Sequence, residues 1–391
     1  MGEKLPSREP LLHTLRDICG PDFARTARAV DRVAGGRVSF VATPATADAV
    51  SAVMRLADER GLAVKARGSG SKIDWGRPPR GVDLIVDTAR LNGLWDHRAE
   101  DRTVEVATGT PVHALQAALA LRGQRLAVDP PSRTATVGGM LAVNESGPLR
   151  HRFGSPAEFV DRVSYVDMHG LAADSDGEDG RPGIAEIDGV LLSARLRLQA
   201  APAASRWVTV PAATPLQVHH VTEQVLALSL GESAIEMDLP APAAARDSTP
   251  PRGTVAVLVE GDATDVTDRA ARLVRELGDE SAAADAAPSW WGRYPFEAAD
   301  VALRISAATA DLHAAVYALS DALRAPVAVR GSVGYGRVHA VLPGGMTAEE
   351  VTAALESVRQ VLLARGGRVV AIVAPPALAR QIDIAGREDL F

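Results

Sequence analysis

The sequence predicts an α+β protein that is built from more than one domain. Its 391 residues are too many for one ordinary hydrophobic core, so two or three domains are expected. Segments with strand character and segments with helical periodicity alternate along the chain, and alanine- and proline-rich connections become frequent after about residue 200. We therefore expect a first part with strand–helix–strand order and a second part that forms a separate α+β layer.

Composition and charge exclude several classes of protein. Apolar residues make up 47% of the chain and charged residues 23%, the composition of a soluble globular protein. The formal net charge of -7 provides no overall basic field, so a nucleic-acid partner is not expected. No stretch approaches the roughly 20 apolar residues of a membrane span, and the first ten residues lack the apolar core of a signal peptide. We expect a cytoplasmic protein without a transmembrane segment, which would reach a membrane surface only through a partner.

The cysteine and histidine content argues against metal chemistry within the chain. Cys19 is the single cysteine, so the chain cannot form an internal disulfide or supply the roughly four thiolates that an iron–sulfur cluster needs. The adjacent residues His219 and His220 point to different sides of a helix or strand. We therefore expect no metal site, and any electrons destined for an iron–sulfur cluster would leave for another polypeptide.

The first elements of the chain follow from its periodicity and its glycines. A polar helix is expected over residues 11–30, followed by a strand at 38–41. Thr46 then opens a helix with one apolar stripe, which Gly61 ends, and a short strand follows at 62–66. This part of the chain therefore has strand–helix–strand order.

The rest of the first half continues this mixture of elements. Further strands are expected at 82–87, 103–108 and 190–198. Thr110 and Pro111 suit the N-cap and first position of a helix that runs to Gly123. Residues 174–188 are rich in acidic side chains, glycine and proline, and an exposed loop is expected there.

The second half predicts a layer of helices on a sheet. Strands are expected at 254–260, 301–306, 337–342 and 368–374, and helices at 266–277, 312–323 and 348–365. Four strands that alternate with three helices indicate a ferredoxin-like α+β layer with one helix extra. Residues 331–336 are expected to form a hairpin turn, and no internal repeat of fixed period is visible.

Two glycine-rich turns are candidate anion sites. Directly after the strand at 62–66 comes a row of small residues, Arg67-Gly68-Ser69-Gly70-Ser71-Lys72, whose backbone amides a ligand can approach closely. A tight turn without a ligand fits this loop alone equally well. It is not a dinucleotide fingerprint, because Ile73 occupies the third glycine position, and it is not a Walker loop. A second turn, Gly138-Gly139, precedes a short helix, and the two turns could hold one pyrophosphate between them.

These segments resemble FAD proteins of the vanillyl-alcohol oxidase and p-cresol methylhydroxylase (PCMH) superfamily. Residues 66–72 with 75–79 are similar to the family's pyrophosphate loop, and residues 129–139 with 144–154 to its second flavin segment. Within the superfamily the likeness is closest to the FAD-binding subunit of bacterial glycolate oxidase. Weaker likeness to the family's cap domain continues at 304–306 and 366–376.

The resemblance implies an organisation and a cofactor site. It implies an N-terminal helical segment at 1–35, a two-subdomain PCMH-type FAD-binding domain at 36–200 and a ferredoxin-like α+β cap or substrate domain at 201–391. The residues implied to bind FAD are Arg67, Gly68, Ser69, Gly70, Ser71, Lys72, Pro130, Thr136, Val137, Gly138, Gly139, Ser146, Gly147, Gly189 and Val190. The first loop and Thr136–Gly139 would hold the pyrophosphate, and the last four residues would line the ribityl and adenine parts.

The same resemblance predicts how the flavin is attached and where the chain departs from the family. Relatives that bind flavin covalently use a histidine in the first loop, where this chain has Ser71, so FAD is expected to be non-covalent. The stretch that accompanies the flavin ring in relatives is shortened here to residues 174–188, and the family's C-terminal tail is not matched before Phe391.

Two functions are compatible with these features. One is an FAD-dependent oxidoreductase that oxidises a small 2-hydroxy acid and passes electrons to a partner subunit carrying an iron–sulfur cluster or a second flavin. The other is a catalytically degenerate FAD-binding or scaffold subunit of an oxidoreductase complex, which the shortened ring-side stretch favours.

Candidate catalytic residues lie on one predicted strand of the second half. Arg337 and His339 alternate there and so share a face. An arginine can hold the carboxylate of a hydroxy acid while a histidine takes the hydroxyl proton. The alternative is that both side chains are solvated on an outer face. Trp290 and Trp291 are interpreted as anchors of their loop on the core rather than as a pocket.

Overall fold

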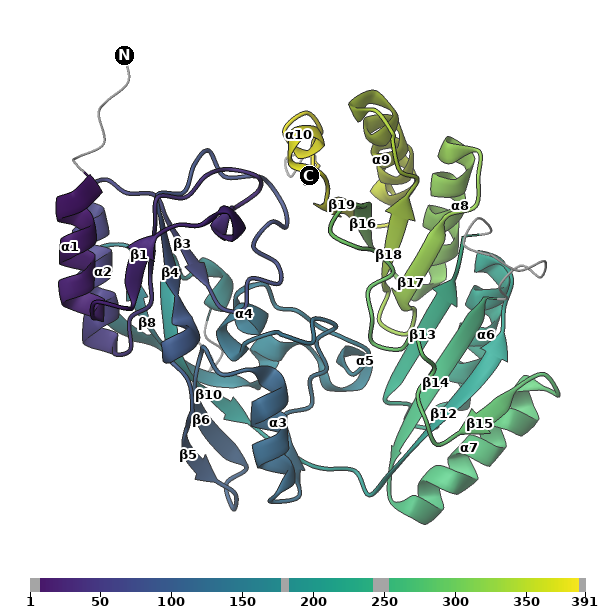
Figure 1. Ribbon diagram of the computed structural model, residues 1–391. Helices are drawn as coiled ribbons and strands as arrows, with labels where there is room; N and C mark the ends of the chain where they lie inside the picture. Colours follow the sequence, from purple (N-terminus) through teal and green to yellow (C-terminus); the bar gives the residue numbers. More distant parts are fainter. Residues whose placement is uncertain (1–7, 177–182, 242–252, 387–391) are drawn as a thin grey trace. The chain divides into compact units, whose positions relative to one another are not determined.

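The computed structural model describes residues 8–176, 183–241 and 253–386 (Figure 1). The chain forms two compact units, each with its own hydrophobic cores. The first unit comprises residues 1–74, 79–146 and 155–201. The second comprises residues 75–78, 147–154 and 202–391.

A small, mostly parallel sheet begins the first unit. Its strands lie in the order β1 (Ala24–Thr26), β2 (Phe40–Ala42), β4 (Leu84–Asp87) and β3 (Val64–Arg67). Strands β2, β3 and β4 are parallel, whereas β1 is antiparallel to β2. Helices α1 (Arg8–Cys19) and α2 (Ala47–Glu59) pack on this sheet through a shared apolar core (Figure 1). Thr46 caps α2, because its Oγ1 accepts a hydrogen bond from the Ala49 amide.

An antiparallel sheet completes the first unit. Its strands lie in the order β5 (Leu94–Arg98), β6 (Thr103–Ala107), β10 (Gly189–Arg197), β8 (Val160–Asp167) and β9 (Ala172–Ser175). The short helix α4 (Val137–Ala142) contacts both β6 and β10. Helix α3 (Val112–Ala120) contacts β7 (Gln124–Arg125), which pairs with β11 (Gln199–Ala200).

The second unit contains one eight-stranded sheet made from two βαββαβ motifs. The first motif comprises β12 (Ala204–Pro211), α6 (Pro215–Leu228), β13 (Ala234–Leu239), β14 (Thr254–Gly261), α7 (Ala263–Leu277) and β15 (Ala282–Ala284). The second comprises β16 (Val301–Ser306), α8 (Leu312–Leu323), β17 (Ala328–Ser332), β18 (Arg337–Leu342), α9 (Ala348–Leu363) and β19 (Arg368–Val373). The strand order is β15-β12-β14-β13-β17-β18-β16-β19. Antiparallel pairing of β13 with β17 therefore joins two ferredoxin-like motifs into one sheet.

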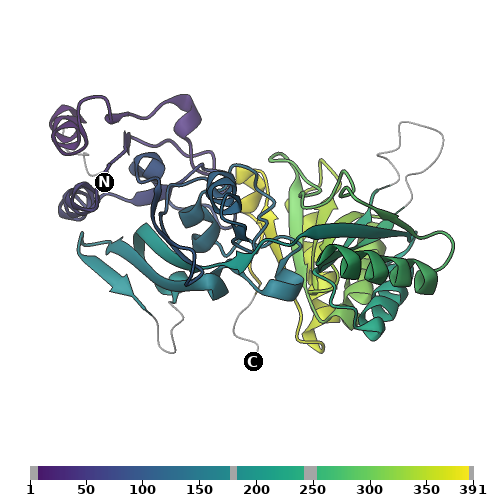
Figure 2. The same cartoon turned by 90° about the horizontal axis from the view of Figure 1, so that it is seen from below.

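The four long helices of this unit cover one face of the sheet (Figures 1 and 2). Side chains alternate along each strand, so Val338 and Ala340 of β18 lie in the core beneath the helices. Arg337 and His339 of the same strand, and Arg304 of β16, consequently belong to the opposite face. This second face, which none of the four long helices covers and which we call the helix-free face for that reason, carries these polar side chains. The short helix α5 (Arg150–Phe153) packs on its other half, against Ala234 and Leu258. A further short helix of the unit is α10 (Pro376–Ala379).

The predicted α+β class and ferredoxin-like layer are confirmed, and the number of motifs is corrected. All four strands and three helices predicted after residue 250 are present. A single motif with an extra helix was wrong, because α6, β12, β13, β15 and β17 were missed and the layer is two motifs. The two motifs repeat in topology only, so no sequence period reveals them.

Three local predictions are also corrected. The helix expected over 11–30 ends at Cys19, because Gly20 adopts a left-handed φ of 100° and β1 follows. Thr110 does not cap α3: its Oγ1 accepts a hydrogen bond from the Gly93 amide at 2.9 Å, and Pro111 is the N-cap residue. The expected loop at 174–188 contains the end of β9 and a 3-10 turn at Ile184–Glu186, and its residues 177–182 lie outside the described residues.

The hairpin turn was placed two residues early. Strand β17 runs through Ser332, so the turn that leads to β18 occupies residues 333–336. Gly331, which looked like the start of the turn, is part of β17 and pairs with Val338. Glycine is needed there because its φ is 146°, which side-chain-bearing residues rarely adopt.

Candidate functional site

The two predicted anion loops meet in the first unit. Gly68 follows β3, and a Cβ atom on it would lie 2.1 Å from Oγ1 of Thr136. Only glycine lets the backbone of the first loop lie this close to the second. Gly70 has a φ of 78°, which also favours glycine. The turns near positions 68 and 138 are therefore neighbours, as one shared pyrophosphate site requires.

The second loop is held by its own capping bond and by Thr108. Oγ1 of Thr136 accepts a hydrogen bond from the Gly139 amide at 3.2 Å, which makes Thr136 the N-cap of α4. Gly138 donates its amide to the Thr108 carbonyl at 2.7 Å, and a Cβ on Gly138 would lie 2.7 Å from Cβ of Thr108. Gly139 is exposed, whereas Gly138 and Val137 are buried. Val137 therefore contributes its side chain to the core and only its backbone to the loop.

Arg67 is engaged with carboxylates of the protein itself. Its guanidinium donates to Oδ2 of Asp87 at 2.7 and 3.0 Å and to Oδ1 of Asp31 at 3.0 Å. Asp31 is 2% exposed and also pairs with Arg25. The hydrogen bond from Arg25 is the main reason that the pKa of Asp31 lies well below its usual range, and the Arg28 amide and Arg67 add to it. Arg67 thus fixes the base of the loop rather than offering an unpaired charge to a ligand.

Lys72 is likewise paired. Its ammonium forms a buried ion pair with Glu145 and donates to Oγ of Ser132. Oε1 of Glu145 accepts from the Ser132 amide at 3.0 Å, so three segments meet at this point. Burial lowers the pKa of Lys72, and the neighbouring Glu145 opposes that effect. Glu145 was not among the predicted site residues. A carboxylate two residues after the apolar segment 137–143 indicated that it needs a partner, because an unpaired buried charge is costly.

Gly189 and Val190, at the start of β10, were also predicted to bind the cofactor, and both are closely packed within the first unit. Val190 is 1% exposed and belongs to the core, and a Cβ on Gly189 would lie 2.1 Å from the Val166 carbonyl. Strand β10 reaches the second loop two residues later, where Oγ1 of Thr108 donates to the Leu191 carbonyl at 2.6 Å. Thr108 is therefore a site residue that the sequence analysis missed.

The other three predicted residues are Pro130, Ser146 and Gly147. Ser146 donates its hydroxyl to the Asn144 carbonyl at 3.2 Å. Pro130 is half-buried, and Gly147 belongs to the second unit. The described contacts of the first unit thus join Arg67–Lys72, Ser132, Thr136–Gly139, Glu145 and Thr108.

A group of arginines surrounds His339 on the helix-free face of the second unit. Arg304 of β16 and Arg330 of β17 are the direct cross-strand neighbours of His339. Nε of Arg330 donates to Oδ1 of Asp238 at 2.8 Å, so this charge is balanced. The His339 ring packs edge-on against Tyr294, with ring centroids 5.1 Å apart.

Arg337 and Arg304 carry charges that no carboxylate balances in the described part of the chain. Nε of Arg337 is buried there without a hydrogen-bond partner, and its guanidinium carbon lies 5.5 Å from the ring centroid of Tyr335. Burial, followed by the nearby Arg150 and Arg304, lowers the pKa of Arg337 to about 10. Burial also lowers the pKa of Arg304. The alternative that Arg337 is merely solvated does not describe this environment.

Aromatic rings flank the arginines. Arg150 of α5 stacks on Tyr335, with its guanidinium carbon 4.2 Å from the ring centroid, and it also donates to the Tyr335 hydroxyl. Trp75 packs against Tyr294 at 5.2 Å between centroids. Trp291 contacts Trp207 of β12 at 6.2 Å, which confirms that it anchors its loop.

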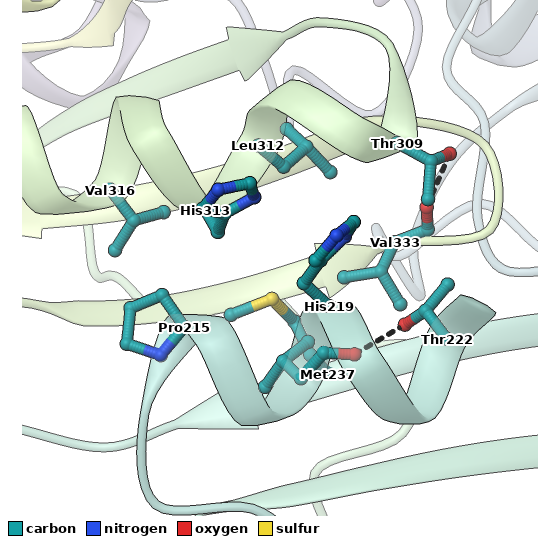
Figure 3. A pocket seen from close by; sticks show the side chains of 10 residues that line it. Pro215, His219, Thr222, Met237, Thr309, Leu312, His313, Val316 and Val333 are labelled. Atoms are coloured by element: carbon teal, nitrogen blue, oxygen red, sulfur yellow. Dashed lines mark hydrogen bonds between the residues drawn. The ribbon is translucent and has the colours of Figure 1, made fainter. Parts of the chain in front are cut away.

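A small, mostly apolar pocket lies on the helical side of the same sheet (Figure 3). His219 of α6 and His313 of α8 face each other there with ring centroids 4.5 Å apart. In the described structure Nδ1 of both rings is buried without a hydrogen-bond partner, and Nε2 of His219 lies 3.3 Å from Glu223. Burial lowers the pKa of His313, and His219 lowers it further. Among all the residues that the structure describes, no group of three or more histidine, cysteine, aspartate or glutamate side chains is arranged to hold a metal ion.

Cys19 is a buried free thiol in the core of the first unit, and burial raises its pKa to about 11. Across residues 8–176, 183–241 and 253–386, none of the helices has the length and apolar character needed to span a bilayer.

Comparison with known proteins finds one matching family and several partial relatives in sequence. Residues 38–174 match the family described as FAD binding domain. D-2-hydroxyglutarate dehydrogenase of Xanthomonas citri pv. viticola is 30% identical over 174 residues, 41% of this chain and 37% of that protein. Glycolate oxidase subunit GlcE of Escherichia coli is 38% identical over 96 residues, 24% of this chain and 27% of that subunit. The matches thus span well under half the length of these curated relatives.

The structural likeness extends over nearly the whole chain. The crystal structure of p-cresol methylhydroxylase with substrate bound has a TM-score of 0.70 and 13% sequence identity. The match covers 94% of this chain and 89% of that one. At this identity the likeness establishes a shared fold, and the chemistry must be argued from the residues of this chain.

Proposed function

We propose that this chain, whose residues 38–174 match an FAD-binding domain, uses FAD as its cofactor in an oxidoreductase reaction on a small 2-hydroxy acid. The electrons would pass to a partner subunit that carries an iron–sulfur cluster or a second flavin, because one cysteine cannot hold a cluster. When bound, FAD supplies the hydride acceptor.

The pyrophosphate of FAD would be recognised mainly by backbone amides. Arg67 and Lys72 are already paired with carboxylates, so they are not the charges that neutralise a phosphate. The amides that would do so belong to the first loop, whose small residues let a ligand approach its backbone closely. The amides of Gly138 and Gly139 already donate to the Thr108 carbonyl and to Oγ1 of Thr136, so the second loop would contribute mainly shape. Ser71 stands where covalent relatives have histidine, and Cys19 is buried, so we propose that FAD is held without a covalent bond.

The substrate would be held on the helix-free face of the second unit. The observation that carries this proposal is the buried Nε of Arg337, which has no hydrogen-bond partner in the described structure and lies two residues from His339 on one face. A guanidinium binds a carboxylate through two parallel hydrogen bonds, which would satisfy that atom. His339 would then accept the proton of the neighbouring hydroxyl as hydride leaves the carbon.

The visible absorption spectrum of the purified protein tests whether it binds FAD and whether a 2-hydroxy acid reduces that FAD. The purified protein should show flavin bands that bleach when glycolate or lactate is added without oxygen. A yellow protein that never bleaches with any 2-hydroxy acid would support the scaffold function instead. A colourless preparation that cannot be reconstituted with FAD would contradict both.

Substitution of Arg337 tests the substrate site separately from the cofactor site. Arg337→Met should keep the flavin but weaken carboxylate binding by about 1.5–3 kcal/mol, roughly 10- to 150-fold in KM. Arg206→Met is the matched control, because Arg206 is a β12 arginine that pairs with Asp285. Equal losses in the two variants would count against a substrate role for Arg337.

Substitution of Gly70 tests the loop. Gly70→Val should abolish FAD retention, because valine is strained at a φ of 78° and its side chain would obstruct the approach of a ligand to the loop backbone. Gly81→Val is the control, since a Cβ on Gly81 meets nothing within 4 Å. Unchanged flavin content in Gly70→Val would show that the pyrophosphate lies elsewhere.

The scaffold function remains the second candidate for one specific reason. The segment that accompanies the flavin ring in relatives is replaced here by the short acidic stretch 174–188. Its described parts are the end of β9 and the 3-10 turn at Ile184–Glu186, and neither supplies the family's ring-side sequence. Failure of bleaching together with retained FAD would favour this function.

A further inference from the structure

The helix-free face of the second unit holds more positive charge than one carboxylate balances. Arg304 and Arg337 are both half-buried, and neither has a carboxylate within ion-pair distance in the described part of the chain. The neighbouring Arg330 shows the contrast, because Asp238 neutralises it. Among the residues that the structure describes, these two guanidinium groups therefore have no counter-charge.

The register of the strands places these two charges on either side of His339. Arg304 is the cross-strand partner of His339, and Arg337 precedes His339 by two residues on the same face. Arg304 and Arg337 are thus diagonal neighbours, whose Cα atoms in an antiparallel pair lie roughly 7–8 Å apart. Their side chains can reach opposite ends of one small molecule that presents a hydroxyl to His339.

Without a bound anion, the charged side chains of Arg304 and Arg337 are in an unfavourable environment. A half-buried guanidinium loses hydration, and two like charges at this spacing repel each other. Burial is the main cause that lowers the pKa of each arginine; repulsion from Arg150 and Arg304 adds to it at Arg337, and repulsion from Arg368 and Arg150 adds to it at Arg304. One carboxylate would balance only one of the two charges, so the second needs a counter-charge of its own.

We propose that this face binds a doubly anionic 2-hydroxy acid, with Arg337 at the carboxylate beside the hydroxyl and Arg304 at the second negative group. The second group is a carboxylate or a phosphate, because a guanidinium binds either through paired hydrogen bonds. This inference rests on the proposed oxidation of a 2-hydroxy acid and narrows its substrate to dianions.

Calorimetric titration of the FAD-loaded protein tests the charge requirement without depending on turnover. Succinate and glutarate serve as dicarboxylates, 3-phosphoglycerate as the phosphorylated acid, and acetate and propionate as monoanions. Dianions should bind at least tenfold more tightly than monoanions. In Arg304→Met the ratio of dianion affinity to monoanion affinity should fall toward one, whereas Arg206→Met should keep the ratio of the original protein.

Arg304→Lys separates charge from folding. It keeps one positive charge on β16, so it should recover part of the preference that Arg304→Met loses, while circular dichroism and flavin content check that both variants fold. If monoanions and dianions bind equally to the original protein, or lose affinity equally in Arg304→Met, the inference is wrong and both arginines serve one carboxylate. Tighter binding of 3-phosphoglycerate than of the dicarboxylates would identify phosphate as the second group.

Anaerobic reduction then separates this inference from the proposed function. Malate, 2-hydroxyglutarate and 3-phosphoglycerate should reduce the flavin at lower concentrations than lactate or glycolate. Arg304-dependent binding of dianions without any flavin reduction would support the anion site and contradict the proposed oxidation. Flavin reduction by lactate and glycolate but by none of the dianions would support the proposed oxidation and contradict the inference that the substrate is a dianion.

Discussion

A methyl group on Gly68 would lie 2.1 Å from Oγ1 of Thr136, closer than two non-bonded atoms can approach. Thr136 in turn caps α4 through that same oxygen. The contact therefore couples the backbone of the first loop to the start of the helix that follows the second. It is the point at which the two halves of the proposed pyrophosphate site are joined.

Gly68→Ala should destabilise the first unit by about 1–3 kcal/mol, the usual cost of overpacking, and should lower the amount of FAD that copurifies. Thr136→Ala alone should cost about 1 kcal/mol through loss of the helix cap. The double variant should lose less than the sum, because removal of Oγ1 relieves the clash. Urea denaturation and flavin absorbance measure both effects. Gly81→Ala is the control, and additive losses would show that the two residues do not touch.

Lys72 and Glu145 should behave as a coupled buried pair. Their side chains are 8% and 2% exposed, so Lys72→Met leaves the Glu145 carboxylate buried without its cation, at a cost of about 3–5 kcal/mol. The double variant Lys72→Met with Glu145→Gln should recover much of that loss, because the glutamine oxygen can still accept from the Ser132 amide. Urea denaturation of the original protein, the two single variants Lys72→Met and Glu145→Gln, and the double variant measures the coupling free energy of the pair. A single-variant cost below about 1 kcal/mol would indicate an exposed pair.

Asp31 should make stability depend on acidity in the lower pH range. Its folded-state pKa lies below the ordinary value of 3.8, so the unfolded chain binds a proton more readily than the folded protein. The stabilisation is therefore complete well above pH 3.8 and is lost as the pH falls from there through the lowered pKa. Asp31→Asn should cost about 3 kcal/mol at pH 7, and its difference from the original protein should shrink below pH 3.8. Denaturation followed from pH 7 to pH 3 measures this, and a constant difference would contradict it.

His313 should add a second pH dependence at higher pH. Its pKa is lowered from 6.5 by burial and by His219, so protonation favours the unfolded chain. The second unit should be fully stable above pH 6.5 and lose stability as the pH falls below that value. His313→Leu should flatten this slope, while the exposed His220→Gln should leave it unchanged. Thermal denaturation between pH 8 and pH 5 measures the slope, and an unaltered slope in His313→Leu would assign the effect to other groups.

The sequence by itself determined the local features. Helix α8 occupies residues 312–323 as predicted, because a strong 3.6-residue apolar period needs no knowledge of its neighbours. The row of small residues at 67–72 was also readable, since a backbone that must approach a ligand or another loop excludes side chains locally. Alternation along 337–342 likewise placed Arg337 and His339 on one face before any pairing was known.

Only the tertiary structure decided which distant residues these features meet. Arg67 and Lys72 were predicted among the residues of the FAD-binding loop, and folding brings Asp31, Asp87 and Glu145 to them from remote segments. Arg304 entered the site because β16 pairs with β18 in one register, and a shift of one residue would have turned it to the other face. Such partners are set by strand register and long-range packing, which depend on the whole chain at once and leave no short-range period in the sequence.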